Sequence, residues 1–125
     1  MTEPDDMGTL SHGSRFIEAL PTAVRWSHAL LAPRLRAGDA VVDATAGNGH
    51  DTVFLAQRVS PGGRVFAFDV QAEALERTKL QITNHKLQTA ASDAIMLIHA
   101  GHEQIENQLP RELKGGIRAF MFNLG

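Results

Sequence analysis

The first residues in this chain that could bind a ligand are an aspartate and a pair of glycines. Asp43 ends a short β-branched run, Gly47 and Gly49 follow it, and an apolar helical pattern begins at Val53. This order predicts a buried strand, a tight turn, and a helix whose free N–H groups face the turn. Glycine has no Cβ, so a ligand can approach the backbone closely. Because open α/β sheets bind ligands at the carboxyl ends of their strands, we expect a nucleotide-like cofactor here.

The spacing of the glycines distinguishes between cofactors. The dinucleotide pattern G-x-G-x-x-G requires a third glycine where this chain has Thr52. The turn instead resembles the first motif of class I S-adenosylmethionine (SAM) methyltransferases, acid-x-Gly-x-Gly-x-Gly, with Thr45 in the first glycine place. The resemblance implies SAM as cofactor, bound by Asp43, Thr45, Gly47 and Gly49. In that family the acid binds the methionine amino group directly or through water. A carboxylate also suits a cationic sulfonium better than a pyrophosphate.

A second acid follows one strand–helix unit later. Asp69 ends the run Arg64–Asp69 and lies 20 residues after Gly49. An acid at the end of the second strand can accept hydrogen bonds from both ribose hydroxyls, and Gln71 is close enough to share that site. The alternative is that Asp69 caps the following helix. The glycine turn earlier in the chain favours ribose binding.

Other polar residues of the same region admit two interpretations each. Gly101 and His102 follow the third predicted strand, where they would lie over an adenine ring; the alternative is a polar loop. His50 could cover the cofactor or form a local hydrogen bond. Asp51 could contact the ligand or stabilise the start of a helix. No histidine has a second ligand at metal-binding spacing, so we expect no metal site.

Alternating strand and helix patterns must position these residues. A helical stretch from Ser14 to about Arg36 comes first, with a second helix starting at Pro21 and a break or kink at Pro33. Residues 86–93 are predicted as a loop or frayed helix, and residues 110–116 as a linker. The predicted strands cover residues 40–43, 64–69, 94–99 and 117–122. The predicted helices run from the glycine turn to about residue 59, from residue 72 to 84 or 85, and from residue 103 to 108.

This order predicts an α/β protein, and the resemblance implies a Rossmann-like class I methyltransferase fold. We expect a parallel sheet in the order 3-2-1-4, with helices on both faces and only the first four strands of the larger class I sheet. Residues 1–13 are polar and contain an acidic cluster, so we expect a disordered tail. Residues 14–125 would form the SAM-binding part of a methyltransferase domain.

Composition excludes several classes of protein. The chain has 125 residues, which suffice for one domain with a core, and a formal net charge of -2, so no basic surplus indicates nucleic-acid binding. Cysteine is absent, which excludes disulfides and thiolate chemistry. No apolar run reaches the roughly 18 residues that a membrane-spanning helix needs. We expect a cytoplasmic protein without membrane contact.

Four segments together narrow the resemblance. They are residues 43–52 (DATAGNGHDT), 68–71 (FDVQ), 99–103 (HAGHE) and 122–125 (FNLG). They resemble the bacterial rRNA methylase family, whose characterised members methylate the aminomethyl group of 5-aminomethyl-2-thiouridine at the tRNA wobble position. The resemblance covers residues 38–125 and implies an RNA substrate, tRNA rather than rRNA. It also implies SAM contacts from six residues: Asn48, His50, Asp69, Gln71, Gly101 and His102.

Asn123 and Leu124 match the start of the family's fourth motif, which places them at the catalytic site by resemblance. An amine must be neutral to accept a methyl group, and the enzyme mainly supplies positioning. The amide oxygen of Asn123 and a neighbouring backbone carbonyl could accept the N–H hydrogens and aim the lone pair. The alternative is that Asn123 is only a polar residue at a strand end.

The family pattern continues beyond this motif, so we expect this sequence to be the cofactor-binding part of a longer enzyme, apparently truncated after the fourth motif. Whether this chain alone is active stays open. The outer edge of the fourth strand, with Phe120 and Phe122, would be bare, which also allows a homodimer. Two alternatives remain: an NAD(P)-binding oxidoreductase fragment, and an inactive interaction module. The sequence indicates no role for Trp26, His28 or His99.

Overall fold

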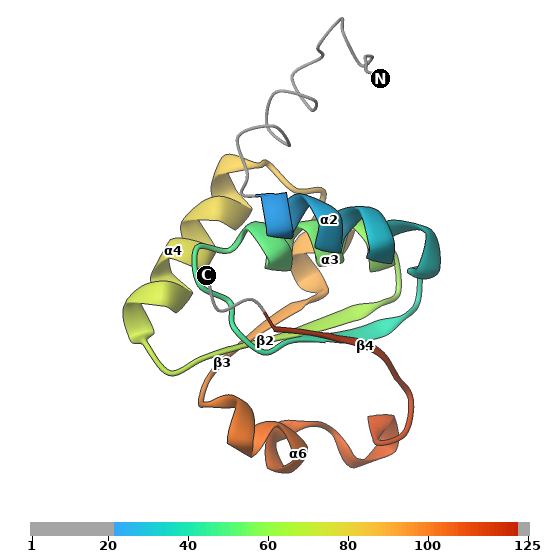
Figure 1. Ribbon diagram of the computed structural model, residues 1–125, viewed down its shortest axis with the longest axis vertical. Helices are drawn as coiled ribbons and strands as arrows, with labels where there is room; N and C mark the ends of the chain where they lie inside the picture. Colours follow the sequence, from blue (N-terminus) through green and yellow to red (C-terminus); the bar gives the residue numbers. More distant parts are fainter. Residues whose placement is uncertain (1–21, 123–125) are drawn as a thin grey trace, which may run out of the picture. The chain divides into compact units, whose positions relative to one another are not determined.

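The computed structural model describes residues 22–122 (Figure 1). Side chains are described from Trp26 onward. The chain divides into two compact units, residues 1–33 and 34–125. The first contains helix α2 (Thr22–Leu31), and the turn η1 (Ala32–Arg34) leads into the second. α2 ends before Pro33, as the proline ring requires. The predicted tail, residues 1–13, lies outside the described residues.

The second unit is built on a four-stranded parallel sheet in the order β3-β2-β1-β4. This confirms the predicted order and fold class. Because all four strands run the same way, their carboxyl ends meet at one edge, which we call the carboxyl edge. The strands are β1 (Ala40–Asp43), β2 (Arg64–Asp69), β3 (Ile95–His99) and β4 (Ile117–Met121).

The strand register aligns the predicted site residues. Asp43, the last residue of β1, pairs with Ala67 on one side and with Met121 on the other. Asp69, the last residue of β2, pairs with His99 of β3. The residues that follow each strand therefore emerge side by side.

Helices cover both faces of the sheet. α3 (His50–Val59) and α4 (Ala72–Asn84) lie on one face, and α6 (Ile105–Gln108) lies on the other (Figure 1). Residues 86–93, predicted as a loop or frayed helix, contain the short helix α5 (Thr89–Asp93). The helix predicted from residue 103 begins as the 3-10 turn η2 (His102–Gln104). A second 3-10 turn, η3 (Arg111–Leu113), interrupts the predicted linker.

The core lies on both faces of β1 and β2. Burial of a large apolar side chain contributes about 1.5–3 kcal/mol, so the central strands hold the unit together. On the α6 face, Phe66 and Phe68 pack with Ile105 and Leu109. On the other face, Ala67 packs with Ala46 of the glycine turn and with Leu75 of α4.

The outer edge of the sheet is open within the described residues. β4 pairs there with β1 only. Phe120 and Phe122 are 51% and 54% exposed, as expected for an edge strand without a further neighbour. The expectation of a bare fourth strand is thus confirmed for residues 22–122.

Candidate functional site

The glycine turn, residues 44–49, joins β1 to α3 and is fixed at both sides by neighbouring strands. The Ala44 N–H donates to the carbonyl of Met121 in β4 (2.8 Å), and the Ala46 N–H donates to the carbonyl of Phe68 in β2 (2.8 Å). The Gly49 N–H then closes the turn on the Ala46 carbonyl (2.8 Å). The turn is therefore held in a defined shape without a ligand.

The two positions of the turn require glycine for different structural reasons. Both have positive φ, 57° at Gly47 and 91° at Gly49. A Cβ on Gly49 would lie 2.8 Å from the Thr78 Cα and 3.2 Å from the Gln81 Cβ, so Gly49 allows α4 to approach. A Cβ on Gly47 would meet only the Thr45 carbonyl oxygen, at 3.8 Å. Open space therefore lies beside Gly47, where a ligand could approach.

Asp43 does not face the crevice, which corrects the expectation from the sequence. Its side chain is fully buried, and both oxygens accept hydrogen bonds from the chain itself. The Thr52 hydroxyl donates to one oxygen (2.7 Å), and the Thr45 N–H donates to the other (3.1 Å). Asp43 therefore joins the end of β1 to the turn and to the first turns of α3. A direct contact with a cofactor is not supported by this geometry.

Burial raises the pKa of the Asp43 carboxyl from 3.8 to about 7, although the hydrogen bond from Thr52 opposes the rise. The folded protein then holds this proton more tightly than the unfolded chain does. The free energy of unfolding should fall as the pH rises from about 4 to about 7, by up to about 4 kcal/mol, and level off above.

Urea unfolding of the wild type and of Asp43→Asn across pH 4–8 tests this expectation. Asparagine is neutral and can keep both contacts, because its amide can donate to the Thr52 hydroxyl. Asp43→Asn should flatten the decline of the free energy of unfolding with pH, whereas Asp39→Asn, at the other end of β1, should leave that decline unchanged. An equal decline in Asp43→Asn would show that Asp43 is not its source.

Asp69 connects the end of β2 to the glycine turn. One carboxylate oxygen accepts the Gly47 N–H (3.0 Å), and the other accepts the Gln71 N–H (2.9 Å). The carboxylate is only partly buried, and each oxygen keeps lone-pair capacity for a further donor. The N-cap of α4 is Gln71, not Asp69. The alternative that Asp69 caps α4 is therefore wrong.

The loop after β3 brings a third group to the carboxyl edge. Gly101 is buried, and a Cβ there would collide with the carboxylate of Glu103, which folds back over it. The exposed ring of His102 makes an edge-to-face contact with Phe122, with centroids 5.9 Å apart and planes at 76°. Residues that follow β3 and β4 therefore meet beside the site.

The remaining predicted residues are distributed around the turn. Asn48 and Gln71 are exposed, and Thr45 and His50 are partly buried. Asp51 lies buried in the first turn of α3, whose N-cap is Gly49 without a side-chain cap. Both interpretations of Asp51 stay open. Asn123 and Leu124 lie outside the described residues, although the strand that precedes them ends at the carboxyl edge.

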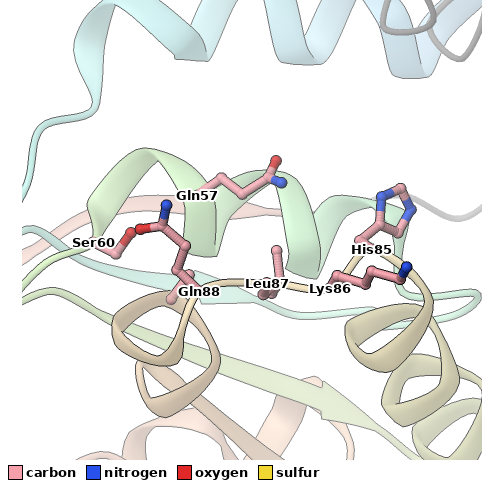
Figure 2. Close-up of a pocket in the computed structure, with 7 residues that line it drawn as sticks. Gln57, Ser60, His85, Lys86, Leu87 and Gln88 are labelled. Carbon is pink, nitrogen blue, oxygen red and sulfur yellow. The ribbon is translucent and has the colours of Figure 1, made fainter.

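Two cavities are lined by residues outside the glycine turn. One, of about 330 Å³, lies between the ends of α3 and α4, at the opposite edge of the sheet, and Figure 2 shows Gln57, Ser60 and His85 around it. Its lining residues come from the C-terminal end of α3, the segment after α4 and the beginning of α5. The other, of about 470 Å³, lies between α6 and β4 and adjoins the loop after β3, because His102, Glu103 and Phe122 line it together with Ile105 and Phe120.

Within residues 22–122, no group of three histidine or acidic side chains is arranged to hold a metal ion. No helix in the same range has the length and apolar character to cross a membrane.

Reasoning from sequence missed three residues of this site: Thr52, Glu103 and His99. The glycine pattern marks Thr52 only as the residue in the third glycine place. A hydroxyl in the first turn of the helix that follows a strand-end acid is the signal for its buried hydrogen bond to Asp43. In the sequence Glu103 is only the first residue of a predicted helix, whereas its carboxylate folds back over Gly101. The His99 Nε2 lies 2.9 Å from the Val70 carbonyl oxygen, a contact that only the strand register explains.

Residues 65–125 match the family model "Putative rRNA methylase". A curated relative, the chloroplastic tRNA (mnm(5)s(2)U34)-methyltransferase of Arabidopsis thaliana, is 29% identical over 108 residues, covering 82% of this chain. A solved rRNA methylase from Streptococcus thermophilus is 37% identical over 85% of this chain, with a TM-score of 0.67. A putative methyltransferase from Streptococcus mutans, solved in complex with SAH, is 34% identical over 85% of this chain, also with a TM-score of 0.67.

The chain spans only part of these relatives. It covers 38% of the plant protein and 57% and 53% of the two streptococcal proteins. The similarity to these solved structures establishes the Rossmann-like methyltransferase fold for this chain.

Proposed function

We propose that this chain, a relative of the rRNA methylases, carries the SAM-binding part of an RNA methyltransferase. One observation carries the proposal: the Asp69 carboxylate and the Gly47 backbone meet at the carboxyl edge with a hydrogen bond of 3.0 Å. The acid proposed to bind the ribose and the open backbone at Gly47 are thereby held together. Open α/β sheets bind nucleotides at this place.

The residues present fit the cofactor. The Asp69 oxygens could accept the ribose hydroxyls, and the open space beside Gly47 would admit the methionine half. Thr45, Asn48, His50 and Gln71 surround the same turn. Gly101 and His102 would lie against the adenine, and Glu103 offers a carboxylate for its amino group. The position that a dinucleotide-binding turn gives to its third glycine is occupied by Thr52, which is buried and bonded to Asp43, and this disfavours the NAD(P) alternative.

Asp43 supports the site without contact to the ligand in this proposal. Its bonds to Thr52 and to the Thr45 N–H hold the turn at the end of β1. The carboxylate still provides a negative potential behind the turn when it is ionised, which favours a cationic ligand. Its role as a cofactor-binding residue is therefore indirect.

The acceptor side of the reaction belongs to residues after β4. SAM supplies an already activated methyl group when it is bound. Asn123 could accept the N–H hydrogens of a neutral amine and orient its lone pair, and Leu124 would contribute a backbone carbonyl. Positioning of this kind can account for a large part of a methyltransferase's rate enhancement.

RNA is the proposed substrate, with an aminomethyl-uridine of tRNA preferred to rRNA. The name of the plant relative, a tRNA (mnm(5)s(2)U34)-methyltransferase, supports this substrate class. We propose a cytoplasmic setting and a homodimer as further expectations. Pairing of two β4 edges would cover the exposed Phe120 and Phe122, and sedimentation of the chain would test the dimer.

Calorimetric titration with S-adenosylhomocysteine (SAH) tests the cofactor. We expect micromolar-range binding, on the order of -8 kcal/mol. NADH serves as the matched control, because it shares the adenosine half but carries a pyrophosphate. Tighter binding of NADH than of SAH would contradict the proposal, as would the absence of SAH binding by a folded chain.

A further inference from the structure

The ladder between β2 and β3 ends in a side-chain contact instead of a backbone one. The last paired residues are Asp69 and His99. Beyond them the Ala100 N–H turns back to the carbonyl of Ile98 (3.0 Å), so it is directed away from β2. The His99 ring replaces this backbone contact with β2, because its Nε2 lies 2.9 Å from the Val70 carbonyl oxygen. Because a carbonyl only accepts, the ring nitrogen must carry the proton and donate.

This contact completes the fixation of a short segment, residues 69–71. Asp69 is held by the Gly47 N–H, and the Gln71 N–H is held by Asp69. His99 holds Val70, the residue between them, by donating a hydrogen bond to the Val70 carbonyl. The peptide plane after Val70 is therefore set by β3, and this plane carries the Gln71 N–H that orients the Asp69 carboxylate.

The segment presents an apolar side chain next to the acid. Val70 is 65% exposed, although residues 65–68 of β2 are fully buried and only the partly buried Asp69 separates them from it. An exposed valine beside a ribose-binding carboxylate offers a surface to a flat apolar ring. Its orientation depends on the same peptide plane, and therefore on His99.

We propose that His99 is a positioning residue for the nucleoside half of the cofactor. It contacts no ligand itself; it fixes the Val70 carbonyl so that Asp69 and Val70 face the ribose and the base. This inference rests on the proposed function and gives a role to a histidine for which the sequence indicated none.

The test compares His99→Leu, which lacks the donor, with His99→Gln, whose amide can restore it. The first measurement is hydrogen exchange of the Gln71 amide in the ligand-free chain. We expect exchange about tenfold faster in His99→Leu and close to wild type in His99→Gln. His85→Leu, at the far end of α4, is the matched control and should leave this amide unchanged.

The second measurement is the affinity for SAH and for adenosine. His99→Leu should weaken both by about tenfold, because both share the nucleoside half, and His99→Gln should recover most of the loss. Unchanged exchange at Gln71, or faster exchange with unchanged affinities, would overturn the role of His99. Absence of SAH and adenosine binding by the wild type would instead overturn the proposed function.

Discussion

Gly49→Ala is expected to lower the free energy of unfolding by about 3 kcal/mol, because the new methyl group meets α4 and the backbone has φ 91°. Its Cβ would lie 2.8 Å from the Thr78 Cα, a backbone atom that can move only with the helix. Overpacking of this kind costs about 1–3 kcal/mol, and a left-handed conformation adds about 1–2 kcal/mol. Urea unfolding followed by circular dichroism measures the change.

Gly47→Ala is the matched control in the same turn. It also has positive φ, but its Cβ would find space, so a loss of about 1–2 kcal/mol is expected from the backbone alone. The methyl group would enter the space proposed for the cofactor and should weaken SAH binding at least tenfold. A larger loss of stability in Gly47→Ala than in Gly49→Ala would contradict this division of roles.

Asp69→Ala is expected to weaken SAH binding by about 100-fold or more. The substitution removes the proposed acceptors of two ribose hydroxyls, and hydrogen bonds to a charged group contribute about 1.5–3 kcal/mol each. It also releases the Gly47 and Gln71 N–H groups that the carboxylate now holds. Calorimetry with SAH and with adenosine should show comparable losses, since both ligands carry the ribose.

Glu73→Ala provides the comparison for this prediction. Glu73 is an exposed acid in the first turn of α4, only four residues from Asp69, so its removal changes the local charge by the same amount. We expect its SAH affinity to stay within about twofold of wild type. If both variants lose affinity equally, a general electrostatic effect and not ribose binding is responsible.

The strand order and most element boundaries could be predicted because they depend on local patterns. β1 and β2 end where a β-branched or aromatic run meets an acid, and both were predicted to the residue. β3 begins one residue later than predicted, and β4 ends one residue earlier. The helix α5 was left open because its five residues, Thr89–Asp93, are too few to show a helical apolar period.

The side-chain contacts of the site could not be predicted from local patterns. The burial of Asp43 depends on Thr52, which only the start of α3 brings close. The reason for Gly49 is a contact with α4, residues 78–81, which no spacing in the turn reveals. The contact between His99 and Val70 likewise requires the register of two strands. Sequence reasoning found where the site lies, and the packing decides what each residue does there.

A nitrogen–proton correlation spectrum of the ligand-free chain, titrated with SAH, tests the central claim most directly, because it reports both binding and location. If the glycine turn is the SAM site, the amide shifts should concentrate at residues 47–50, 70–71 and 101–102. The amides at residues 85–88, beside the cavity at the opposite edge of the sheet, should remain in place (Figure 2). Shifts confined to residues 85–88, or no shifts at millimolar SAH, would contradict the account.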